Sequence, residues 1–72
     1  MQFDYSKLLG RIKECGYTQE RLAEEIGISK ATMSVKLNNK AHFGQVETFR
    51  ICVALGISSS EIGAYFFTKK VR

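Results

Sequence analysis

Two cysteines and one histidine, Cys15, Cys52 and His42, are the residues of this chain with the widest range of chemistry. A structural zinc site uses four cysteine or histidine ligands in close pairs, and these three residues have neither that number nor that spacing. A cysteine nucleophile needs a neighbouring base, and nothing in the spacing places His42 beside either thiol. We therefore expect no enzyme activity, no metal and no cofactor.

The two cysteines fall within helical apolar patterns, which favours a structural role. We predict that Cys15 and Cys52 are small buried hydrophobic residues and that they do not form a disulfide. His42 lies in a polar segment, residues 39–44, that ends in glycine. It is expected to be a loop residue, with a phosphate contact as the alternative.

The size and composition of the chain indicate one small helical protein. Its 72 residues, 44% of them hydrophobic, predict a single folded domain spanning residues 1–72. Its longest apolar run, residues 51–55, is much shorter than the ~20 residues that a membrane helix needs. We expect a soluble cytoplasmic protein of a bacterial host cell, with no membrane partner and no small-molecule substrate.

The net charge of +4 is concentrated in two short stretches. Residues 29–44 contain three lysines and no acidic residue, and residues 65–72 contain two lysines and an arginine. Such patches suggest a polyanionic partner such as nucleic acid, although ordinary solubilising charge would have the same composition.

Capping residues, glycines and the helical period predict an all-α fold with five helices. The first is capped by Asp4 or Ser6 and runs to about Cys15, and the others cover about residues 19–26, 30–38, 45–55 and 59–64. Residues 65–72 form an aromatic and basic tail with an extended segment as one option.

Packing predictions follow from the apolar periodicity. Val46, Phe49 and Val53 recur at helical spacing and are predicted to form the core stripe of the fourth helix. Tyr65 to Phe67 are expected to be divided between core and interface, because a domain of this size cannot bury three consecutive aromatic residues.

Residues 19–38 have the spacing of a helix-turn-helix. Only Gly27, Ile28 and Ser29 separate two short helices. Ala23 is small where the second helix must approach closely, and Gly27 can adopt the positive φ that the corner requires. Thr18 and Ser29 are good N-caps for the two helices.

The sequence QERLAEEIGISKATMSVKLN, residues 19–38, resembles the helix-turn-helix of Cro/repressor-type (XRE-like) regulators. The five-helix plan extends the resemblance over residues 3–64, and residues 3–8, 36–40 and 65–67 are similar to short regulators of temperate phages. The resemblance implies a compact lambda-repressor-like DNA-binding domain. It further implies transcription regulation in a lysis–lysogeny switch, as a Cro-like repressor or as a modulator that associates with the phage repressor.

The resemblance also implies which residues meet double-stranded operator DNA. In such proteins the third helix enters the major groove. The implied DNA-binding residues are Gln19, Ser29, Lys30, Ala31, Ser34, Val35, Lys36, Asn38 and Lys40. Among these, the positions of Gln19, Lys36, Asn38 and Lys40 imply backbone contacts, and those of Lys30, Ala31, Ser34 and Val35 imply base contacts.

The outer face of the third helix leaves a second function open, since Ala31 and Val35 form a small apolar patch with few hydrogen-bonding groups. Val35 has three interpretations: a base contact, a protein interface, or an ordinary surface residue. The alternative function is therefore a modulator or antirepressor that binds the cognate phage repressor. We expect association with itself or with that repressor, through the tail aromatics Tyr65, Phe66 and Phe67 or through the fourth and fifth helices.

Overall fold

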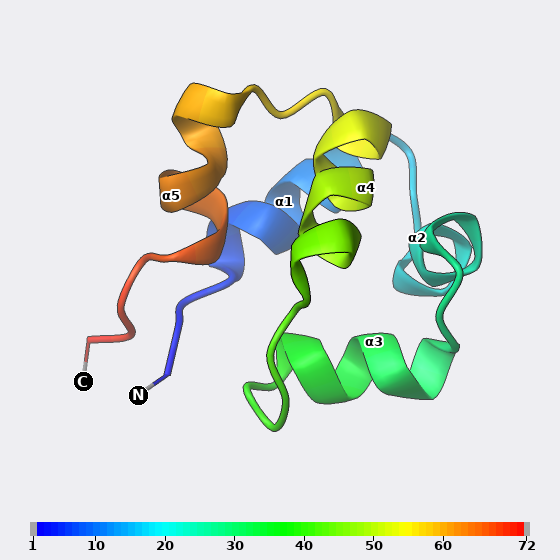
Figure 1. The fold of residues 1–72 in the computed structure, drawn as a ribbon, viewed down its shortest axis with the longest axis horizontal. Coiled ribbons are helices and arrows are strands. Elements are labelled where there is room, and N and C mark those ends of the chain that lie inside the picture. Colours follow the sequence, from blue (N-terminus) through cyan, green and yellow to red (C-terminus); the bar gives the residue numbers. More distant parts are fainter. Residues whose placement is uncertain (1, 72) are drawn as a thin grey trace.

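The computed structural model describes residues 2–71 and confirms an all-α fold for this part of the chain. The helices are α1 (Ser6–Glu14), α2 (Gln19–Ile26), α3 (Lys30–Leu37), α4 (Gln45–Leu55) and α5 (Ile62–Phe66), with a short 3-10 helix η1 (Ser59–Glu61) before α5. Figure 1 shows α3 along one edge of the molecule, with α2 at its N-terminal end and the loop to α4 at its C-terminal end.

Helices α2, α3 and α4 begin or end at residues suited to those positions, whereas the N-cap of α1 is Tyr5 and not the predicted Asp4 or Ser6, and it makes no side-chain capping bond. The Thr18 hydroxyl accepts a hydrogen bond from the Arg21 amide at 3.0 Å, and the Ser29 hydroxyl accepts one from the Thr32 amide at the same distance. Gly27 and Gly56 end α2 and α4 with φ of 86° and 66°. These contacts are local in sequence, which is why the predicted bounds of α2 and α4 match the structure.

The core is built from one face of each α-helix. Its fully buried members include Leu8 of α1, Leu22 of α2, Met33 of α3 and Ile51 of α4. Ala23 is also buried, at 1% exposure, and thus allows α2 to pack closely against its neighbours. Within residues 2–71, no helix has the length and apolar character needed to cross a membrane.

The predicted core stripe of α4 is wrong. Val46, Phe49 and Val53 are 60%, 67% and 67% exposed, and α4 instead buries Ile51, Cys52 and Leu55. This helix carries apolar residues on more than one face, so periodicity alone could not choose the face that meets the core.

The prediction that both cysteines are buried is confirmed for Cys52 and wrong for Cys15. Cys52 is buried, and burial raises the pKa of its thiol, whereas Cys15 is exposed, contrary to the prediction. Because α1 ends at Glu14, Cys15 lies in the following turn and leaves the buried face of the helix. Its Sγ donates a hydrogen bond to the Leu55 carbonyl at 3.6 Å, and both thiols are free.

The last helical segment is longer than predicted and includes two residues assigned to the tail. The Glu61 carboxylate accepts hydrogen bonds from the amide and the hydroxyl of Ser58, at 3.1 and 3.0 Å, and these bonds lower the pKa of Glu61. Tyr65 and Phe66 belong to α5 and are buried, so the tail begins at Phe67. Phe66 packs edge-on against the Phe43 ring, a partner more than twenty residues away.

The two ends of the described chain lie side by side. Phe3 and Lys69 form an antiparallel bridge, with flanking hydrogen bonds from the Asp4 amide to the Thr68 carbonyl and from the Lys70 amide to the Gln2 carbonyl. Figure 1 shows both ends near the loop that follows α3. The extended option for the tail is thus realised over these few residues.

Candidate functional site

The exposed face of α3 carries the residues predicted to contact bases. Met33 and Leu37 are buried at 0% and 9% exposure, which turns the opposite side of the helix to solvent. On that side Ala31, Ser34 and Val35 are exposed. The helical periodicity therefore predicted correctly which side of α3 faces solvent.

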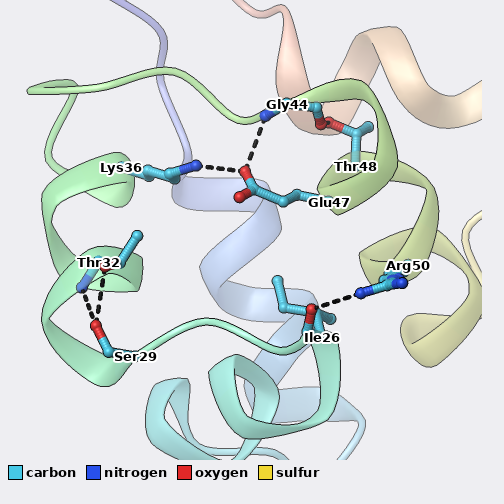
Figure 2. A network of polar contacts seen from close by, with 8 residues as sticks. All are labelled: Ile26, Ser29, Thr32, Lys36, Gly44, Glu47, Thr48 and Arg50. Atoms are coloured by element: carbon cyan, nitrogen blue, oxygen red, sulfur yellow. Dashed lines mark hydrogen bonds and ion pairs between the residues drawn. The ribbon is translucent and has the colours of Figure 1, made fainter.

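The turn between α2 and α3 holds the two helices at a defined angle. Gly27 has a left-handed backbone, and the next amide, of Ile28, donates to the Ala23 carbonyl at 2.9 Å. The Arg50 guanidinium donates to the Ile26 carbonyl at 3.2 Å, which ties α4 to the same corner, as Figure 2 shows. The Ile26 carbonyl at the end of α2 thus accepts a hydrogen bond from α4. The orientation of α3 therefore depends on both α2 and α4.

Lys36, a predicted phosphate contact, is engaged within the molecule. Its ammonium forms an ion pair and hydrogen bond with the Glu47 carboxylate, and its side chain is only 13% exposed (Figure 2). The same carboxylate oxygen accepts the Gly44 amide at 2.9 Å, where α4 begins. These two donors lower the pKa of Glu47, so the carboxylate stays ionised and holds Lys36.

Asn38 and Ser29 also use their side chains to end and begin α3. The Asn38 amide donates to the Ser34 carbonyl at 2.8 Å, and Nδ2 lies 3.4 Å from the Ser34 hydroxyl. Ser29 caps the helix through its hydroxyl, which bonds both the backbone and the hydroxyl of Thr32 (Figure 2). Part of the hydrogen-bonding capacity of these two side chains is therefore used within the helix.

The remaining predicted contacts form a sparse surface. Gln19, Lys30 and Lys40 are exposed polar residues, at the start of α2, at the start of α3 and after its end. Between the two lysines, α3 presents Ala31 and Val35, with Val35 40% exposed. The structure thus places a small apolar centre between two cations.

The loop after α3 is fixed by a residue whose role the sequence did not reveal. Asn39 has a φ of 64°, and its side-chain amide bonds both the amide and the carbonyl of Phe3, at 2.8 and 2.9 Å. Asparagine tolerates the left-handed region better than most residues, so the residue type at position 39 was the sequence signal for this backbone conformation. His42 is exposed in this loop, as expected.

Of the three aromatic residues predicted at an interface, only Phe67 is accessible. Tyr65 and Phe66 are 8% and 3% exposed, whereas Phe67 is 60% exposed and its ring lies edge-on to that of Phe3 at 5.8 Å. Phe67 lines an open hollow of about 640 Å³ beside α4, together with Phe49 and Val53. Phe67 and the fourth helix were both expected at an interface, but Phe49 and Val53 were assigned to the core, so the sequence did not predict that they would share this surface.

Comparisons with known proteins show the family of the chain and a similar solved structure. Residues 1–69 match the family described as "Protein of unknown function (DUF739)". A similar solved structure is the solution structure of the modulator of repression (MOR) of the temperate bacteriophage TP901-1 from Lactococcus lactis. It is 39% identical with a TM-score of 0.80, and the match covers 100% of this chain and 97% of that chain. No curated protein sequence matches.

Proposed function

This chain belongs to the DUF739 family, and on that premise we propose that it regulates a temperate-phage repression switch by binding the phage repressor through the exposed face of α3. Regulation of this kind agrees with the similarity to a modulator of repression over the full chain. The proposed place of action is the host cytoplasm, and the proposed activity involves no catalytic step.

The observation that carries the proposal is the apolar centre of the α3 face. Ala31 and Val35 offer no hydrogen-bonding side-chain group to a base edge, and Lys36 is held by Glu47. Operator recognition relies on donors and acceptors that reach the major groove, whereas a protein interface is built around a desolvated apolar centre with polar groups at its rim. Lys30 and Lys40 would form that rim.

A second candidate is direct binding to operator DNA by a helix-turn-helix. It is favoured by the three-residue turn between α2 and α3 and by the exposed Gln19, Lys30 and Lys40. In such complexes the start of the first helix and the cations around the second contact phosphates. DNA affinity from so few cations would be weak and strongly salt-dependent unless a partner adds contacts.

The two candidates respond differently to single substitutions. We expect Val35→Asp to weaken binding to the cognate repressor by at least about tenfold, because it places a charge in a desolvated contact. Lys30→Ala and Lys40→Ala should change that affinity only slightly. Fluorescence anisotropy measures the affinity for labelled repressor and, separately, the affinity for labelled operator DNA. Each titration is done at about 50 and about 200 mM salt.

Val71→Asp is the matched control, since Val71 is 89% exposed and lies in the tail outside α3. Unchanged repressor binding by Val35→Asp would contradict the first candidate. If, in addition, each lysine variant weakened DNA binding and reduced its salt dependence by about one counterion, the second candidate would replace it.

A further inference from the structure

Helix α4 exposes an apolar stripe that residues 2–71 leave uncovered. Ile51, Cys52 and Leu55 enter the core, while Val46, Phe49 and Val53 on the other side are 60%, 67% and 67% exposed. A helix with apolar residues on both sides is typical of one that is buried on both sides in its working state.

The exposed stripe borders a hollow in which none of the lining residues, within the described part of the chain, is charged. The hollow measures about 640 Å³, and its lining includes Phe43, Thr48, Cys52, Ile57, Ile62 and Phe67. Phe49 stands at this hollow and is two-thirds exposed. The surface therefore combines an exposed aromatic ring with an uncharged recess.

The area of this surface is close to what a stable interface requires. The four exposed side chains, those of Val46, Phe49, Val53 and Phe67, present on the order of 450 Å² of apolar area. Because roughly 60% of a protein interface is apolar, this corresponds to about 750 Å² per partner, near the ~800 Å² of a standard interface. A patch of this size is comparable with the largest apolar patch of a typical monomer, which is often functional.

The polarity of the surface favours a second copy of the chain as its occupant. The chain carries a net charge of +4, yet none of the described residues that line the hollow is charged, so two copies can meet there without a like charge inside the recess. A two-fold axis beside Phe49 would place that ring of each copy in the hollow of the other, which satisfies the self-complementarity of a symmetric dimer.

We propose that the exposed stripe of α4 and the adjoining hollow form the interface of a symmetric homodimer. This surface lies on a different element from the α3 face, so the dimer would carry two α3 faces. The inference does not rest on the function proposed for α3.

Sedimentation equilibrium of the full chain alone, from about 1 to about 300 μM, tests the interface. The chain is expected to sediment as a dimer at the upper concentrations. Val53→Glu should weaken dimerisation by at least about tenfold, since it places an unpaired charge in the contact. Val35→Glu is the matched control, because it is the same substitution at an exposed valine of α3, and it should leave dimerisation unchanged.

Thermal unfolding of each variant separates a lost interface from a lost fold, since neither valine is part of the core. The proposal is overturned by a chain that stays monomeric throughout, or by a dimer that Val53→Glu leaves intact or that Val35→Glu disrupts equally. A monomeric chain whose binding to the repressor is lost with Val53→Glu would assign the α4 surface to the repressor instead.

Discussion

The Glu47 carboxylate links the proposed binding helix α3 to the start of α4. It accepts the Lys36 ammonium from α3 and the Gly44 amide at the start of α4 (Figure 2). A charge-assisted pair between half-buried groups contributes more than an exposed ion pair does, because solvent screens it less. Glu47 therefore stabilises the fold and at the same time removes a cation from the α3 surface.

This arrangement predicts an acid-sensitive contribution to stability. The folded state lowers the pKa of Glu47 below its ordinary value of 4.5, so its stabilisation is present above that pH and is lost as the pH falls through the folded-state pKa. We expect Glu47→Gln to lower the free energy of unfolding by about 1–2 kcal/mol near pH 7 and by much less near pH 3.

Urea unfolding at both pH values measures the difference. Glu24→Gln, at an exposed position in α2, is the control and should have little effect at either pH. An equal loss of stability by Glu47→Gln at both pH values would show that the ionised carboxylate is not what stabilises the protein.

At the scale of the elements, the α2–α3 corner depends on a backbone conformation that side chains resist. Gly27 has a φ of 86°, and a Cβ added there would lie 3.5 Å from the Arg50 guanidinium, which is ordinary contact. The difficulty for another residue is thus the backbone and not the space. Gly10, in the middle of α1, has no such conformation and nothing within 4 Å of an added Cβ.

The same substitution should therefore act in opposite directions at these two glycines. Gly27→Ala is expected to destabilise the protein by about 1–2 kcal/mol, since alanine is strained at positive φ. Gly10→Ala should stabilise it by up to about 1 kcal/mol, because alanine favours a helix interior. Urea unfolding of both variants beside the parent chain gives the two signs, and a stable Gly27→Ala variant would show that the corner tolerates another geometry.

At the scale of the whole molecule, Asn39 joins segments that are far apart in the sequence. Its amide holds the backbone of Phe3, and Phe3 in turn pairs with Lys69 near the other end of the chain. The loop after α3 and both ends of the described chain thus meet at one residue, which lies next to Lys40 of the proposed binding surface.

Removal of this junction should destabilise the protein in two separable ways. Asn39→Ala loses both hydrogen bonds and strains the left-handed backbone, with an expected cost of about 2–3 kcal/mol. Asn39→Gly loses the bonds but relieves the strain, so it should be about 1 kcal/mol less severe. Thermal and urea unfolding compare the two with His42→Ala, an exposed loop control expected to be near neutral. Equal effects of alanine and glycine would argue against backbone strain at this position.

Sequence patterns were sufficient to predict the all-α class, the bounds of α2 and α4 and the side of α3 that faces solvent. Caps such as Thr18 and Ser29 bond residues only three positions away, and Met33 and Leu37 define a buried stripe within one short helix. These features depend on interactions between near neighbours, which the order of residues specifies directly.

Tertiary structure alone decided which side of α4 is buried, that Glu47 holds Lys36, and that Tyr65 and Phe66 belong to the core. In each case the partner comes from another element of the fold. An apolar stripe or a lysine has the same sequence pattern whether or not such a partner exists. The physical reason is that burial and ion pairing depend on distances through space, which local periodicity does not contain.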